Sequence, residues 1–172
     1  MELRNAIAAR RAVRAYKDAP VEKAQLEQVL KAGCAAPVGK GLYDHLRLTV
    51  IQDKGILHAI SEGLKANMHV DFDPLYNAPA LILVSSQKMP FPNIEYADAG
   101  CILENMMLEA TELGLGSVVI WGSSMAVNAV PELKRALQIP DDYTAVSGIV
   151  VGHANQTVEP KELSLSIQTD WI

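Results

Sequence analysis

The longest helical pattern in the chain is the stretch IEYADAGCILENMMLEATEL, residues 94–113. Apolar and small side chains lie on nearly every side of its helical wheel, which is typical of a helix buried in a core. Gly114 and Gly116 follow directly and supply a helix end. Because Asp98 and Asn105 would be costly to bury without a partner, we expect both to form structural hydrogen bonds inside the protein.

Shorter patterns lie on both sides of this helix. Helical spacing of apolar residues predicts four further helices, at residues 2–11, from about 21 to 35, around 56–64 and at about 130–137. Strand patterns occupy residues 46–50, 80–84, 117–121 and 145–152. The run 80–84 is apolar throughout, so we expect it at the centre of a sheet with both faces covered. The sequence therefore predicts a helix-rich α+β protein of one domain, residues 1–172.

Composition restricts the classes of function. The 172 residues are 49% hydrophobic and carry a net charge of -5, whereas a nucleic-acid-binding surface needs excess positive charge. The longest apolar runs are strand-sized, far below the roughly 20 residues that span a bilayer. Glu2, Arg4, Arg10 and Arg11 interrupt every stretch that could serve as a secretory leader. We therefore expect a cytoplasmic protein that acts without nucleic acid and without a membrane.

Several common catalytic patterns are missing from the sequence. It contains neither a Gly-rich dinucleotide fingerprint nor a phosphate-binding P-loop, and Ser123 is not part of a nucleophile elbow. The four histidines never pair at helical spacing, so no metal site is predicted. Cys34 and Cys101 also lack metal-ligand spacing and lie in helical patterns rich in Ala, Gly and Leu, so we expect both to be buried small apolar residues.

Cationic residues gather near the start of this acidic chain. Arg4 is followed by the run Arg10-Arg11-Ala12-Val13-Arg14, which places four of the 15 lysines and arginines within the first fourteen residues. Guanidinium groups bind phosphate in a bidentate manner, so one interpretation of the run is an anion site. The other interpretation is a solvated basic surface, and the run alone does not choose between them.

Three separated motifs resemble those of the nitroreductase family. Residues 10–16, RRAVRAY, resemble the opening motif of that family and are followed at a suitable distance by Ala35-Ala36-Pro37. Residues 96–117 resemble its central helix and the turn that leaves this helix, and residues 147–153, SGIVVGH, resemble its last core strand. The resemblance implies an α+β fold with a central, mostly antiparallel sheet flanked by helices. It also implies an FMN cofactor, NAD(P)H as the reductant and a homodimer.

The resemblance assigns roles to individual residues. It implies that Arg10, Arg11 and Arg14 contact the FMN phosphate and ribityl chain, and that Arg14 or the backbone of Ala12 reaches the pyrimidine edge. The family usually has Ser at the position of Ala12, so only main-chain groups can serve there. Relatives commonly place a Lys and an Arg beyond the last strand, where this chain offers only Lys161.

A bend after the third predicted strand is the implied contact for the reactive part of the flavin. Ile120, Trp121 and Gly122 occupy the place where the family passes main-chain N–H groups beneath flavin N5. Gly122 would allow the closest approach of the backbone to the ring. Trp121 is equally consistent with packing at a strand end.

The loop at Pro37, Val38 and Gly39 is a second implied contact. Its glycines fit a tight turn as well as a close approach of the backbone to the flavin or substrate. Residues 38–44 differ from the loop of larger relatives, so the resemblance leaves the substrate open. Asn67 lies where some relatives place a residue that reads the flavin pyrimidine, and a helix-end cap is the alternative for this residue.

The last segment, about residues 154–172, ends in apolar residues at alternating positions, among them Leu163, Leu165, Ile167 and Trp171. Such a face would be exposed if the tail trailed free of the protein. The tail therefore either folds back or lies along a second subunit. We favour an arm exchanged between the subunits of a dimer.

Flavin carries the chemistry of hydride transfer, so the resemblance requires no catalytic side chain. The hypothesis is a ping-pong reaction in which NAD(P)H reduces FMN at N5 and leaves, after which a small acceptor such as a nitroaromatic or quinone is reduced at the same site. Two alternatives stay open. One is a protein that holds or senses FMN without turnover, and the other is a different flavin reaction on the same scaffold, such as enone reduction or dehalogenation.

Overall fold

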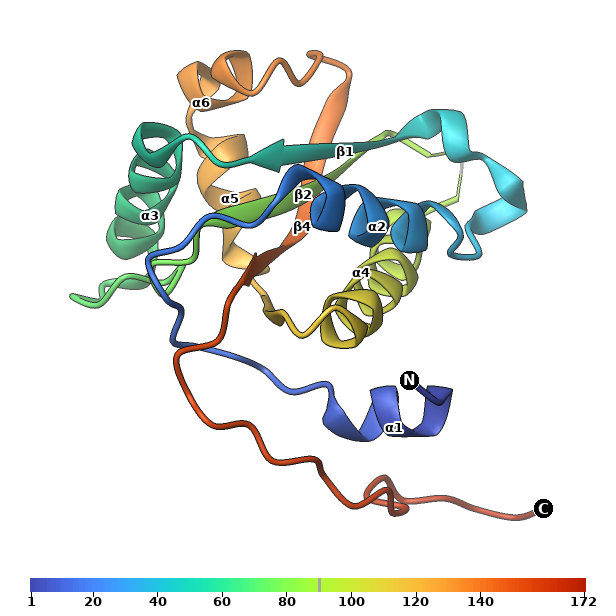
Figure 1. Cartoon of the computed structure of the whole chain (residues 1–172). Helices are drawn as coiled ribbons and strands as arrows, with labels where there is room; N and C mark the ends of the chain where they lie inside the picture. The colour runs from blue at the N-terminus through green and yellow to red at the C-terminus, as the bar shows by residue number, and fades with distance from the viewer. Residues whose placement is uncertain (90) are drawn as a thin grey trace.

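The computed structural model describes residues 1–89 and 91–172 (Figure 1). Its elements are α1 (Leu3–Ala9), α2 (Lys23–Cys34), the 3-10 turns η1 (Gly39–Gly41) and η2 (Tyr43–His45), β1 (Leu46–Ile51), α3 (Lys54–Met68), β2 (Ala80–Gln87), α4 (Ile94–Glu112), β3 (Gly116–Val119), α5 (Gly122–Ala129), α6 (Pro131–Ala136) and β4 (Tyr143–Gly152). Each helix and strand predicted from the sequence is present, with ends shifted by a few residues. Helix α5 is an additional element that the sequence pattern did not predict.

A four-stranded sheet in the order β1-β2-β4-β3 forms the middle layer, and each of its strand pairs is antiparallel. β2 lies in the interior of the sheet, as its continuous apolar run predicts. Leu81 and Leu83 on one face join a core with α3, α5 and α6, whereas Ile82 and Val84 on the other face join a core with α2 and α4. The predicted α+β fold, with an antiparallel sheet between helices, is confirmed (Figure 1).

Helix α4 is buried on one face only. Asp98 and Asn105 form the expected hydrogen bonds, in which Asp98 accepts the Gly39 N–H at 2.8 Å and the Asn105 amide donates to the Ala32 carbonyl at 3.2 Å. The opposite face, which we call the α4 stripe, is exposed and consists of Tyr96, Ala97, Gly100, Cys101 and Glu104. A Cβ built on Gly100 would meet nothing within 4 Å. The expectation of a helix buried on all sides is therefore wrong for a single chain.

Both cysteines lie at the surface. Cys34 is the last residue of α2, and Cys101 belongs to the α4 stripe. The prediction that they are buried is wrong, because the core covers the neighbouring positions of the same helices instead. Gly33 and Ile102 are the buried residues at these two places.

The segment that carries the arginines is fixed to the end of the sheet. Ala12 forms a parallel bridge with Ser117 in β3, and Tyr16 forms an antiparallel bridge with Ala154 just beyond β4. The buried Tyr16 hydroxyl donates to the Val13 carbonyl at 2.8 Å. Burial raises the pKa of the Tyr16 phenol well above its usual range. Tyr16 therefore anchors the segment as a neutral core residue.

The chain beyond β4 passes back along the N-terminal segment and then leaves the body of the molecule (Figure 1). The Asn155 N–H donates to the Ala15 carbonyl at 2.8 Å, and the Lys161 N–H donates to the Ala8 carbonyl at 2.9 Å. Every residue from 161 to 172 is exposed. The apolar side chains of the tail are thus uncovered in a single chain.

Helix α5 has glycine and two serines in its first turn, residues with lower helix propensity than alanine or leucine. The Ser123 hydroxyl donates to the Ile120 carbonyl at 2.6 Å, and the Ser124 hydroxyl donates to the Trp121 carbonyl at 2.8 Å. The buried face of α5 packs on α3 and β4. This packing offsets the low helix propensity of the first turn. Within residues 1–89 and 91–172, no helix combines the length and the hydropathy needed to cross a membrane.

Candidate functional site

The arginine segment, residues 10–14, lies beside the first part of the tail. Arg10 Nε is 3.3 Å from Glu104 Oε1 on the α4 stripe. Arg11 Nη1 donates to the Glu159 carbonyl at 3.3 Å. The Arg11 contact is at the surface, and the half-buried Arg10 side chain pairs with a carboxylate that is itself exposed, so neither guanidinium group is locked into a buried ion pair.

The other predicted phosphate contacts lie along the same edge. The Arg14 N–H donates to Gln156 Oε1 at 3.1 Å, while Arg14 itself is exposed. Ala12 is held on β3 and has no side-chain hydroxyl to offer. The backbone bond from Lys161 to Ala8 brings the tail next to this segment. One chain thus gathers the residues Arg10, Arg11, Ala12, Arg14 and Lys161.

The bend after β3 leads directly into α5. The Ile120 N–H donates to the Gly148 carbonyl at 2.8 Å, which holds the bend on β4, and the Trp121 side chain is 66% exposed. This exposure shows that Trp121 is not a core packing residue in the single chain. A Cβ on Gly122 would lie 2.5 Å from Leu64 Cδ2, so packing on α3 already requires a glycine at this position.

The end of α3 lies against the same bend. Met68 Sδ is 4.0 Å from the Cβ position of Gly122, and Asn67 next to it is exposed. The C-cap of α3 is His69, which has a left-handed backbone with φ of 54° and donates its N–H to the Lys65 carbonyl. The helix-end cap is therefore His69 and not Asn67. A flavin contact remains the prediction for Asn67.

The loop at Pro37, Val38 and Gly39 lies elsewhere in the molecule. In Figure 1, η1 and η2 lie at the right-hand edge, whereas the arginine segment runs along the lower side of the molecule. Lys40 has a left-handed backbone with φ of 53°, and its ammonium group is 4.2 Å from the centroid of the Phe91 ring. One chain does not bring this loop to the bend after β3.

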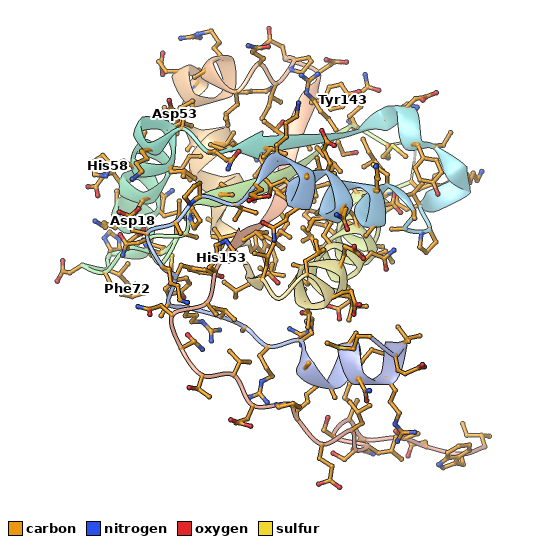
Figure 2. The ribbon with its side chains drawn as sticks, in the orientation of Figure 1. Asp18, Asp53, His58, Phe72, Tyr143 and His153 are labelled. Atoms are coloured by element: carbon orange, nitrogen blue, oxygen red, sulfur yellow. The ribbon has the colours of Figure 1, made fainter. Side chains whose placement is uncertain are left out.

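A cavity of about 750 Å³ lies between residues 16–20, α3 and residues 73–79. Asp18 and His58 lie on this side of the molecule (Figure 2). The Asp73 carboxylate shapes one wall, because it accepts the Leu75 N–H at 2.9 Å and the Asn77 N–H at 2.6 Å.

The residues that line this cavity are distinct from the predicted flavin contacts. They come from three separate segments and form no motif, so the sequence offered no signal for them. Among the residues that the structure describes, no group of His, Cys, Asp and Glu side chains is arranged to hold a metal ion.

Comparison with known sequences identifies the class of protein to which this fold and its arginine segment belong. The model of the nitroreductase family matches residues 7–153. Because this match spans most of the chain, the chain belongs to the nitroreductase family.

Individual relatives are distant but similar over most of the chain. FMN reductase (NAD(P)H) of Bacillus subtilis is 30% identical over 159 residues, which cover 83% of this chain and 62% of that protein. An Archaeoglobus fulgidus protein, whose name pairs NADH dehydrogenase with NAD(P)H nitroreductase, is 28% identical over 148 residues, which cover 84% of this chain and 80% of that protein. The crystal structure of a Bacteroides fragilis nitroreductase with bound FMN has a TM-score of 0.86 and 25% identity, with 100% of both chains covered.

Proposed function

We propose that this chain binds FMN and passes hydride from NAD(P)H through flavin N5 to a small acceptor, such as a nitroaromatic or a quinone, in a ping-pong reaction. The arginine segment carries the proposal, because its backbone is fixed to β3 while Arg11 and Arg14 stay exposed. The relatives support the proposal, since one is named an FMN reductase and another was solved with FMN bound.

The arginine segment has the charge and the geometry that a phosphate monoester needs. Guanidinium groups form bidentate hydrogen bonds with phosphate oxygens. Arg11 and Arg14 can turn toward a phosphate without breaking a buried contact, and Arg10 can do so by leaving the exposed Glu104 carboxylate. Lys161 in the adjacent tail would add a fourth cation. Ala12 would contribute through its backbone alone.

The bend after β3 fits the ring of the same cofactor. Ile120 is bonded to β4, so the main chain at Trp121 and Gly122 is held in place. Asn67 at the end of α3 can offer its amide to the pyrimidine edge. When bound, FMN supplies the hydride chemistry, and these residues need only orient the ring and leave one face open to substrates.

We propose a homodimer because one chain does not gather all the predicted flavin contacts. In one chain the loop at 37–39 lies at the right-hand edge of Figure 1, away from helix α5 that follows the bend, whereas a second copy related by a two-fold axis can place its loop there. The α4 stripe and the tail, residues 154–172, supply apolar surface for a partner to cover. In this arrangement the tail is an arm exchanged between subunits.

Anaerobic titration of the FMN-loaded protein tests the proposed reaction. Addition of NADH or NADPH should bleach the yellow colour at a catalytic rate, and a quinone or a nitroaromatic should restore it. Loaded protein that neither nucleotide bleaches would instead be an FMN-holding protein. Bleached protein that only enones or halogenated compounds reoxidise would indicate a different reaction on the same scaffold.

A further inference from the structure

Asp98 connects helix α4 to the loop that carries Gly39. The residue is 4% exposed, and its Oδ1 atom accepts the Gly39 N–H at 2.8 Å. The Oδ2 atom is buried and has no hydrogen-bond partner among the residues that the structure describes. Burying a carboxylate costs free energy unless its oxygen atoms are hydrogen-bonded. The retained bond to Gly39 therefore indicates that Asp98 has a specific role at this position.

Two more contacts hold the loop against the same end of α4. A Cβ on Gly39 would lie 2.1 Å from Ile94 Cδ1, so the loop backbone lies directly on that side chain. The Lys40 ammonium lies over the Phe91 ring in a cation–π contact. We call Phe91, Ile94 and Asp98 together the α4 seat.

Asp98 supplies the directional contact of the α4 seat. Apolar packing and a cation–π contact allow the loop to slide, whereas a hydrogen bond to a carboxylate fixes one backbone atom in place. Lys40 and Gly41 both have left-handed backbones, with φ of 53° and 67°. For a residue other than glycine this conformation is uncommon, so the loop needs an external anchor to keep it.

We propose that Asp98 is a positioning residue that sets where residues 37–39 meet the flavin and the substrate stacked on it. The inference rests on the proposed function, in which this loop contacts the flavin bound by the partner subunit. Asp98 does not touch the substrate in this account, because its carboxylate faces a backbone amide. Asp98 affects the reaction only through the position of Gly39 and its neighbours.

Two substitutions at Asp98 separate the hydrogen bond from the rest of the fold. Asp98→Asn keeps an oxygen that can accept the Gly39 N–H, and Asp98→Ala removes it. In the Asp98→Ala variant, hydrogen–deuterium exchange of residues 37–41 should accelerate in the FMN-free protein, and the Kd for FMN should rise. The kcat/KM for the acceptor should fall on the order of tenfold to a hundredfold, with a rise in KM, because small displacements of a positioning group have effects of this size on the rate. Asp98→Asn should stay close to the wild type in all three measurements.

Asp53→Ala is the matched control. The Asp53 carboxylate also accepts one backbone N–H, that of Ile56 at 2.9 Å, but it does so at the start of α3. This variant should lower Tm while leaving the exchange of residues 37–41 and the KM unchanged. The control therefore distinguishes a local effect on the loop from a general loss of stability.

If Asp98→Ala does not fold, Gly39→Ala tests the same loop from its other side. The added Cβ would push the loop off Ile94, and the further change Ile94→Ala would make room for it. Gly39→Ala alone should accelerate exchange and raise the KM, and the double variant should restore both.

The proposal is overturned if Asp98→Ala matches the Asp53→Ala control in loop exchange and KM, or if Asp98→Asn is impaired as much as Asp98→Ala. It is also overturned if Gly39→Ala accelerates exchange and the double variant does not restore it. Wild-type protein that binds no FMN would refute the proposed function instead. In that case, exchange of residues 37–41 in the FMN-free variants still tests the hold of Asp98 on the loop.

Discussion

The double substitution Arg10→Ala and Arg11→Ala removes two guanidinium groups that we propose bind the FMN phosphate. A hydrogen bond to a charged group contributes about 1.5–3 kcal/mol, so the loss of one such bond from each arginine removes about 3–6 kcal/mol. Since 1.4 kcal/mol corresponds to a factor of ten, the Kd for FMN should rise about 100-fold to 10,000-fold.

The fold should tolerate this change. Arg10 contacts the exposed Glu104 carboxylate, and Arg11 contacts a carbonyl of the exposed tail. Surface contacts of this kind contribute about 0–1 kcal/mol each. The free energy of unfolding should therefore fall by no more than about 2 kcal/mol, a small effect beside the loss of FMN affinity.

Quenching of flavin fluorescence measures the Kd, with riboflavin titrated in parallel because it lacks the phosphate. The control Arg47→Ala with Arg135→Ala removes the same charge, at β1 and at the α6 pair with Glu132. This control should keep wild-type affinity for FMN. Unchanged FMN affinity in the Arg10 and Arg11 variant would refute the phosphate contact. An equal loss of riboflavin affinity would place the damage at the ring and not at the phosphate.

Three further changes test other parts of the account. Gly122→Ala places a Cβ 2.5 Å from Leu64 Cδ2, so the free energy of unfolding in urea should fall by about 1–3 kcal/mol. Unchanged stability would show that packing on α3 does not confine the bend. Tyr16→Phe leaves the Val13 carbonyl without its buried donor and should cost about 1–3 kcal/mol in thermal unfolding, whereas a neutral result would remove Tyr16 as the anchor of the arginine segment. Removal of residues 162–172 should weaken the proposed dimer, seen in light scattering as dissociation at higher protein concentrations than for the full chain, and an unchanged dissociation would contradict an exchanged arm.

Much of the fold could be predicted from the sequence because its central elements have strong local patterns. The continuous apolar run at residues 80–84 predicted the interior strand β2, and the long pattern at 94–113 predicted α4. The missed helix, α5, begins with Gly122-Ser123-Ser124, whose intrinsic propensity argues against a helix. It forms because Ala126 and Val127 pack into the core, which is information that the local sequence does not contain.

The candidate site could be predicted only in part. The arginine run stands out because cations are concentrated there in an acidic chain. The bond from Asp98 to Gly39 joins residues far apart in the sequence, so no local pattern indicates it. The sequence also does not indicate that Cys101 is exposed, because a helical pattern does not say which side of the helix the core covers.

Equilibrium titration of the FMN-free wild-type protein with FMN and with riboflavin tests the proposed phosphate site most directly. The account predicts one FMN per chain, an affinity at least about 100-fold above that for riboflavin, and weaker FMN binding as salt increases. Equal affinity for the two ligands would contradict the role of the arginine segment. The absence of saturable binding for either ligand would contradict the flavin assignment itself.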